Sequence, residues 1–144
     1  MKEISGDIWD YHKQENWIVV TTNGTVNRNG ACVMGKGIAL QAKQRFPRLP
    51  HDLGSIIKLR GNHVTLQPYC HIFTFPTKHD WWERSDLELI KQSCKELVEI
   101  VSAFKPPFYL VRPGCSNGRL NWKDVKPILE KYFDDRFIVV ENSG

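Results

Sequence analysis

The chain has no closely spaced cysteines, no long apolar run and no strong excess of one charge. Its four cysteines form no C-x-x-C pair, which predicts a reducing compartment with neither disulfides nor a zinc site. No segment approaches the ~18 consecutive apolar residues of a membrane span, and the first residues contain no apolar signal core. These absences predict a soluble, cytoplasmic protein without a membrane partner.

Charge and reactive side chains exclude several further classes. Lys and Arg number 20 against 16 Asp and Glu, a mild excess that permits an anionic ligand without requiring nucleic acid. His71 and His79 are too few and too poorly placed for a metal site, and no Ser/His/Asp or Cys/His constellation occurs. We therefore expect any catalysis to proceed without a metal or a cofactor.

Stretches with strand character alternate with stretches of helical periodicity, as in α/β proteins. A length of 144 residues fits one domain, 1–144, and we expect a monomer. Strands are predicted near residues 1–5, 16–22, 55–59, 63–67, 69–74, 108–111 and 136–140. The strands within 55–74 are joined too tightly for parallel crossovers, which predicts a mixed sheet.

Three helices are predicted from periodicity and caps. The first runs from Gly35 or Gly37 to Phe46, where Pro47 ends it. The second opens at Ser85, which forms a capping-box pattern with Glu88, and continues to Pro106-Pro107. The third spans 125–133 with Asp124 as its N-cap, which places Pro127 at the tolerant N3 position.

Two glycine-rich loops each follow an apolar strand and precede a helix. The first, residues 23–37, contains Gly24, Gly30, Gly35 and Gly37, and the second spans residues 112–120. Glycine lets the backbone approach a ligand closely, and the first turn of a helix offers free N–H groups to an anion. Neither loop matches G-x-x-x-x-G-K-[ST] or G-x-G-x-x-G, so each alone could be an ordinary turn. Two such loops facing one crevice predict an anion or nucleotide cradle.

The combined pattern resembles the macrodomain family, whose members bind ADP-ribose on a three-layer α/β/α sandwich around a mixed sheet. More narrowly, it is similar to the branch that holds the terminal ADP-ribose protein glycohydrolase and the antitoxin that removes ADP-ribose from DNA. The resemblance covers nearly the whole chain. It is carried by Gly6-Asp7-Ile8, Asn23, Val33 through Gln41, Thr77-Lys78, Pro113-Gly114-Cys115 and Gly118 through Trp122.

The resemblance implies a role for each part of the site. Asp7, with Ile8 beside it, is expected to accept from the adenine amino group, and Lys78 to act at the anomeric carbon of the distal ribose. A lysine with a lowered pKa could attack that carbon or hold the leaving group. The ribose-binding and diphosphate-binding residues are expected to be Asn23, Gly35, Lys36 and Gly37 in the first loop and Ser116, Asn117, Gly118, Arg119 and Leu120 in the second.

One position departs from the family pattern of the protein glycohydrolase. That enzyme has an aspartate where this chain has Gly118, whereas the DNA-directed branch has glycine and keeps the lysine. Asp80 lies two residues from Lys78. We do not expect its carboxylate to replace the missing one.

Three functions are compatible with the sequence. The first is an enzyme that hydrolyses an ADP-ribosyl bond on a nucleobase or a carboxylate, with DNA or protein as the modified partner. The second is a module that binds ADP-ribose or a related NAD metabolite without turnover. The third is a nucleic-acid binder with Trp81, Trp82, Lys78 and Arg84 as a stacking, basic rim, which merges with the first if the rim contacts modified DNA.

Overall fold

A six-stranded mixed sheet organises the computed structural model, which describes residues 1–142. The strands lie in the order β1-β6-β5-β2-β4-β3, and all neighbours pair in parallel except β3 and β4. The antiparallel pair confirms the predicted mixed sheet. The strand bounds are β1 Lys2–Gly6, β2 Trp17–Asn23, β3 Thr65–Gln67, β4 Ile72–Lys78, β5 Phe108–Val111 and β6 Phe137–Asn142.

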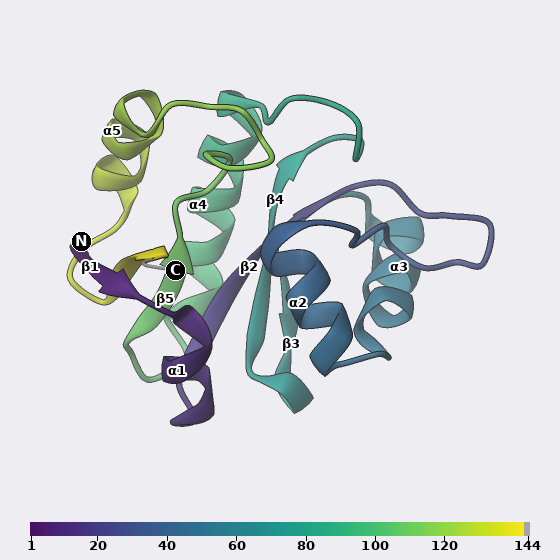
Figure 1. The fold of residues 1–144 in the computed structure, drawn as a ribbon, viewed down its shortest axis with the longest axis horizontal. Coiled ribbons are helices and arrows are strands. Elements are labelled where there is room, and N and C mark those ends of the chain that lie inside the picture. Colours follow the sequence, from purple (N-terminus) through teal and green to yellow (C-terminus); the bar gives the residue numbers. More distant parts are fainter. Residues whose placement is uncertain (143–144) are drawn as a thin grey trace.

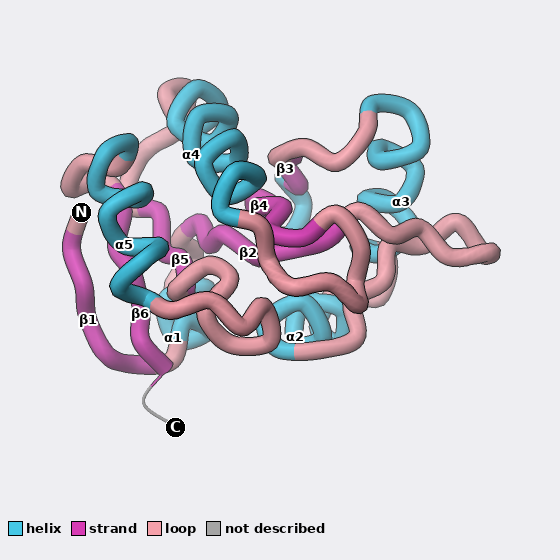
Figure 2. The backbone as a smooth tube through the Cα atoms, turned by 90° about the horizontal axis from the view of Figure 1, so that it is seen from above, coloured by secondary structure: helices cyan, strands magenta, loops and turns pink. Residues whose placement is uncertain are grey.

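Helices cover both faces of this sheet. Figures 1 and 2 show α4 and α5 on one side of the strands and α1 and α2 on the other. The helices are α1 Ile8–Lys13, α2 Gly37–Arg45, α3 Leu49–Arg60, α4 Leu87–Val101 and α5 Trp122–Tyr132, with a short 3₁₀ turn η1 at Pro68–Cys70. The arrangement confirms the predicted three-layer α/β/α fold.

Two apolar cores lie on opposite faces of the sheet because side chains alternate along a strand. In β2, Val19 packs into the core under α4 and α5, while Ile18 and Val20 pack into the core under α1, α2 and α3. All three side chains are fully buried. Burial on both faces is typical of central parallel strands. Parallel pairing of β2 with β5 directs the carboxyl ends of both strands to the same edge of the sheet.

The predicted strand at 55–59 is wrong, since these residues belong to α3. Leu49 and Leu53 are buried at a spacing of four residues, with Ile57 packed against the same core. Helical packing against the sheet therefore overrides the local strand preference of the β-branched pair in this segment. Gly54 allows the helix to approach the first loop, because a Cβ there would collide with the carbonyl of Gly30.

The predicted starts of two helices are also wrong. Asp86, rather than Ser85, caps α4, and its carboxylate accepts from the Glu88 N–H at 2.9 Å. The last helix, α5, begins at Trp122, so Pro127 lies inside it. The Trp122 side chain fixes this early start through tertiary contacts, since its indole donates to Glu3 at 3.1 Å.

Among residues 1–142, no helix has the length and apolar character that crossing a membrane requires.

Candidate active site

A cleft of about 830 Å³ lies at the carboxyl ends of the central strands. The loops that follow β1, β2, β4 and β5 line it, and it lies where the strand order reverses direction, the usual ligand site of open α/β sheets. All the predicted site residues except Arg119 contribute to its walls. These are Asp7, Ile8, Asn23, Gly35, Lys36, Gly37, Lys78, Ser116, Asn117, Gly118 and Leu120.

One end of the cleft is built around Asp7 and Trp9. Asp7 caps α1, and its Oδ1 accepts from the Trp9 N–H at 2.9 Å. The indole of Trp9 donates to Gln41 Oε1 at 2.7 Å, and the Arg45 guanidinium lies 4.1 Å over the ring. Trp9, Gln41 and Arg45 were not predicted as ligand-binding residues from the sequence. Gln41 and Arg45 lie four residues apart on α2, and this spacing is a local signal that could have indicated that they share one face.

The first loop is held in shape by Asn23. Its Nδ2 donates to the Val33 carbonyl at 2.9 Å, and its Oδ1 accepts from the Thr25 N–H at 3.0 Å. A shift in strand register after Thr22 sets Asn23 opposite Lys78. Asn23 therefore links the start of the first loop to Val33 near its end, in addition to its predicted contact with the ribose.

The N-terminus of α2 opens into the cleft. Lys36 occupies the N-cap position and provides no side-chain cap, and Gly37 has a left-handed φ of +58°. The first intrahelical bond comes from Leu40, so the N–H groups of the first turn remain free. Free N–H groups and the helix dipole favour an anion at this position.

The second loop presents further N–H groups to the same cleft. Within residues 1–142, the N–H groups of Ser116, Asn117 and Gly118 donate no hydrogen bond. The loop is closed by backbone bonds from Arg119 to Ser116 at 3.1 Å and from Leu120 to the Gly114 carbonyl at 2.9 Å. Successive free N–H groups of this kind form an anion-binding concavity.

Two buried side-chain polar atoms in the described chain lack a hydrogen-bond partner, and both belong to residues that line this cleft. They are Ser85 Oγ and Arg112 Nε. A buried polar atom without a partner costs about 1–3 kcal/mol, and such atoms are rare in folded proteins. Both residues belong to the wall of the cleft. Ser85 was predicted only as a helix cap, so sequence reasoning missed it.

Gly118 leaves no room for a side chain. A Cβ there would collide with Ser85 Oγ and would lie 2.6 Å from the Gly114 carbonyl. The Ser85 N–H also donates to the Gly118 carbonyl at 3.0 Å, which fixes the close approach. The glycine that departs from the protein glycohydrolase pattern therefore has a steric reason, since the aspartate of that enzyme does not fit this loop.

Lys78 ends β4 and stands between the two loops. Its Nζ donates to the carbonyls of Trp81 and Asn117, each at 3.3 Å. Burial lowers the pKa of Lys78, and the positive charges of Arg119 and Lys36 lower it further. Arg119 does not line the cleft, yet it acts on the site through this charge.

Other reactive groups near Lys78 are engaged or inert. Burial raises the pKa of Cys115 to about 11, so its thiol stays protonated at neutral pH. Asp80 accepts from the Thr25 hydroxyl at 3.1 Å, and His79 pairs with Asp86 at 2.8 Å. None of the described residues forms a cluster of three His, Cys, Asp or Glu side chains that could hold a metal. Lys78 thus lines the cleft with a lowered pKa, whereas Asp80 and His79 do not line it.

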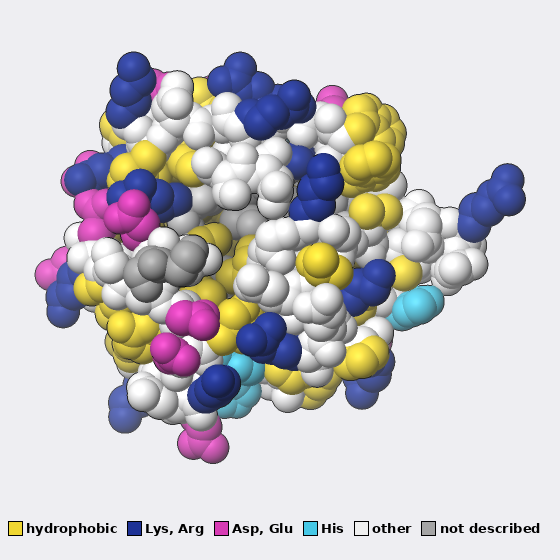
Figure 3. Space-filling view, in the orientation of Figure 1, with side chains coloured by type: hydrophobic (Ala, Val, Ile, Leu, Met, Phe, Trp, Pro, Cys, Tyr) yellow, Lys and Arg dark blue, Asp and Glu magenta, His cyan; other side chains and the backbone are white. Residues whose placement is uncertain are grey.

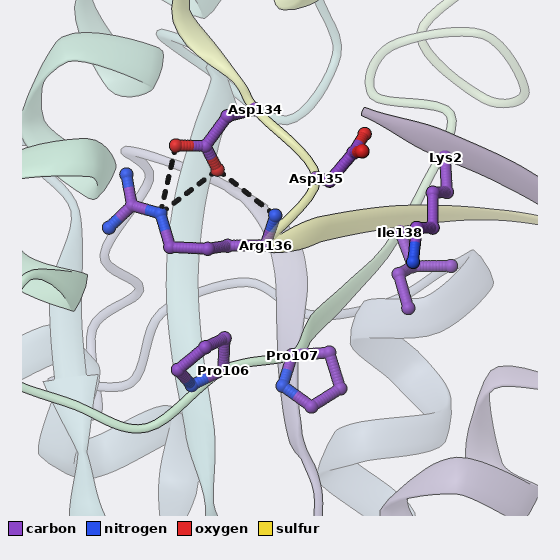
Figure 4. Close-up of a pocket in the computed structure, with 7 residues that line it drawn as sticks. All are labelled: Lys2, Pro106, Pro107, Asp134, Asp135, Arg136 and Ile138. Carbon is purple, nitrogen blue, oxygen red and sulfur yellow. Dashed lines mark hydrogen bonds and ion pairs between the residues drawn. The ribbon is translucent and has the colours of Figure 1, made fainter.

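A second cavity of about 750 Å³ lies at the amino ends of the parallel strands, away from the cleft (Figure 4). Its acidic groups are already paired. Asp134 contacts the Arg136 side chain at 2.9 Å, and Asp135 lies 3.3 Å from the N-terminal amine. Figure 4 shows the Asp134 carboxylate turned toward Arg136, so the cavity offers no free acidic group for chemistry.

Comparison with known proteins relates the chain to one group. No family model matches it. It is 34% identical over 120 residues to the Mycobacterium tuberculosis protein named DNA ADP-ribosyl glycohydrolase. This match covers 76% of the chain and 33% of that protein. It is 33% identical over 119 residues to the Thermus aquaticus protein of the same name, covering 74% and 32%. The chain thus spans about a third of the length of these curated relatives.

A solved structure agrees with the sequence relatives. The macrodomain of Mycobacterium tuberculosis DarG superposes with a TM-score of 0.78 at 26% identity, covering 99% of this chain and 100% of that one. The described fold, the two glycine loops and these relatives lead to one assignment: the chain belongs to the macrodomain family, in the branch of the DarG macrodomains.

Proposed function

We propose that the protein binds ADP-ribose in this cleft and hydrolyses an ADP-ribosyl bond on a macromolecule, with Lys78 as the catalytic residue. The observation that carries the proposal is a lysine of lowered pKa placed between two anion-binding loops. The curated relatives, named for hydrolysis of ADP-ribosyl groups on DNA, favour a modified nucleobase over a modified carboxylate.

The two sets of free N–H groups support a diphosphate ligand. The N-terminus of α2 and the second loop face one cleft, and they are close enough that a Cβ on Gly37 would lie 2.8 Å from Asn117 Nδ2. A diphosphate held between them would extend its adenosine toward Asp7 and its distal ribose toward Lys78. The cleft volume of about 830 Å³ falls in the range of small-molecule sites.

The contacts of Lys78 orient its amine for attack. A neutral amine has two N–H bonds, and the carbonyls of Trp81 and Asn117 accept both. The remaining tetrahedral position, the lone pair, then has no partner in the described chain. A lowered pKa increases the neutral fraction at a given pH, so the same environment both frees and directs the lone pair.

The proposed reaction has two steps. The Nζ of Lys78 forms a bond to the anomeric carbon of the distal ribose while the bond from that carbon to the base breaks. The leaving base takes the bonding electrons and a proton released by the amine. Water then attacks the same carbon and transfers one proton to the Lys78 nitrogen, so the bond between them breaks, the neutral amine is restored and ADP-ribose carries the new hydroxyl.

The alternative is a module that binds ADP-ribose without turning it over. The absence of space at Gly118 favours this reading, because it leaves Lys78 without a carboxylate from the second loop. Asp80 does not replace that group, since its carboxylate is bonded to Thr25 and does not line the cleft.

The test compares the wild type with Lys78→Ala. ADP-ribose affinity is measured by calorimetry, and release of free ADP-ribose is measured from an ADP-ribosylated single-stranded oligonucleotide and from a glutamate-modified protein. We expect the variant to lose about 10²-fold or more of its rate while keeping its affinity. Binding by the wild type without release from either substrate would support the non-catalytic module instead.

A further inference from the structure

Two neighbouring tryptophans are exposed beside the cleft. Trp81 is 47% exposed and Trp82 is 60% exposed, with ring centroids 5.9 Å apart and planes at 90°. They lie on the segment that joins β4 to α4, where Figure 3 shows hydrophobic side chains next to Lys and Arg side chains. Large exposed apolar groups in one place often mark an interaction site.

Hydrogen bonds fix the segment that carries these rings. The Trp81 N–H donates to the Thr25 hydroxyl at 3.0 Å, and the same hydroxyl donates to Asp80 at 3.1 Å. The Gly24 N–H donates to the His79 carbonyl at 3.1 Å, and Glu83 accepts from the Asp80 N–H at 2.9 Å. The backbone of the segment is therefore bound to the first loop, which fixes where the two tryptophans leave the main chain.

The tryptophan pair stands at the reactive end of the cleft. Trp81 lines the cleft, and its carbonyl accepts from Lys78 Nζ at 3.3 Å. In the proposed reaction the macromolecule is attached to the carbon that Lys78 attacks. Trp81 is therefore beside the point at which the macromolecule is attached, and Trp82 follows it outside the cleft lining.

The charges around the rings complement an anionic strand. Within residues 1–142, Lys36, Arg84 and Arg119 form no ion pair, although all three are exposed. Of the acidic groups on the segment, Asp86 pairs with His79, while Asp80 accepts from the Thr25 hydroxyl of the first loop and Glu83 from the Asp80 N–H. A strand with one negative charge per nucleotide suits free cations interleaved with aromatic faces.

We propose that Trp81 and Trp82 form a stacking surface for single-stranded nucleic acid, on which a base next to the ADP-ribosylated nucleotide packs. The proposal rests on the function proposed above and assigns two residues of this chain to hold the strand beside the reacting nucleotide. Bases offer a free flat face only when they are unpaired, so a single strand fits exposed rings where a duplex does not. A peptide offers neither regular flat faces nor a regular charge.

The test uses binding, so that it does not depend on hydrolysis. In the Lys78→Ala background, calorimetry compares free ADP-ribose with a single-stranded deoxyoligonucleotide that carries ADP-ribose on one base. We expect the oligonucleotide to bind about tenfold more tightly than ADP-ribose, and Trp82→Ala to remove this gain without changing the affinity for ADP-ribose. Tyr69→Ala is the matched control, since Tyr69 is 45% exposed but lies before β4, outside the cleft lining.

The outcomes separate this proposal from the catalytic one. An oligonucleotide that binds no better than ADP-ribose, or a gain that survives Trp82→Ala, would overturn the stacking surface even if Lys78 proves catalytic. A glutamate-ADP-ribosylated peptide that shows the same Trp82-dependent gain would also overturn it, in favour of a protein substrate. A wild type that releases no ADP-ribose from the oligonucleotide, while the Trp82-dependent gain in affinity is intact, would remove only the catalytic role and leave the stacking surface standing.

Discussion

Gly118→Ala tests whether the second loop depends on the close contact between Gly118 and Ser85. The new Cβ would collide with Ser85 Oγ and approach the Gly114 carbonyl to 2.6 Å. The serine side chain can rotate away, but the backbone carbonyl cannot. The loop must therefore shift, and the shift breaks the bonds from Ser85 N–H to the Gly118 carbonyl and from Leu120 N–H to the Gly114 carbonyl.

The expected magnitude follows from these losses. Each backbone hydrogen bond contributes about 1 kcal/mol net, so the free energy of unfolding should fall by about 2–3 kcal/mol when residual crowding is included. Displacing the three free N–H groups of residues 116–118 from a bound diphosphate should weaken ADP-ribose binding about 100-fold. Urea denaturation measures the first quantity, and calorimetry measures the second.

Gly35→Ala is the matched control, because Gly35 also lines the cleft but a Cβ there would meet no atom within 4 Å. We expect it to stay within about 0.5 kcal/mol of the wild type. The double variant Ser85→Gly with Gly118→Ala removes only the collision with the hydroxyl, so most of the defect should persist. The steric reasoning is refuted if Gly118→Ala has the same free energy of unfolding as Gly35→Ala in urea denaturation.

Two further predictions concern titratable groups. The Arg119 charge lowers the pKa of Lys78, so Arg119→Gln should raise that pKa. The rising limb of the pH–rate profile should then move to higher pH. A rate that falls as pH rises would instead indicate that the lysine acts as an acid. Asp86→Ala should cost about 1–2 kcal/mol by removing the cap of α4 and the exposed pair with His79, whereas Glu88→Ala should cost little. The hydrogen bond with His79 lowers the pKa of Asp86. The contribution of the Asp86 carboxylate to the free energy of unfolding is therefore present above about pH 4 and is lost as pH falls through the lowered pKa. Urea denaturation should show the stabilities of variant and wild type converging in that range.

Local patterns in the sequence were sufficient to predict most of the fold. The helix after residue 85 shows strict apolar spacing, and the run at 108–111 is apolar throughout, as expected for a strand buried on both faces. The two glycine loops follow such strands, so their meeting at one sheet edge could be deduced before any coordinates. The predicted strand at 69–74 stops short of Lys78, which the structure makes the last residue of β4.

The failures share a physical cause, which is that tertiary contacts decided them. Residues 55–59 are helical because Leu49, Leu53 and Ile57 pack together against the sheet, and the local preference of two isoleucines does not reveal this. The start of α5 depends on Trp122 contacting Glu3, which is far away in the chain. Local propensity is a weak prior whenever burial favours another arrangement.

The chemistry of the site divides in the same way. The sequence by itself determined which residue types follow which strands and where the glycine loops lie, because side-chain type and the order of elements along the chain are read directly from it. Only the tertiary structure decided that Gly118 has no space for a side chain, that Ser85 Oγ and Arg112 Nε lack partners beside the cleft, and that Trp81 contacts Lys78. Each of these depends on ångström-scale distances between distant segments, which packing of the whole core sets.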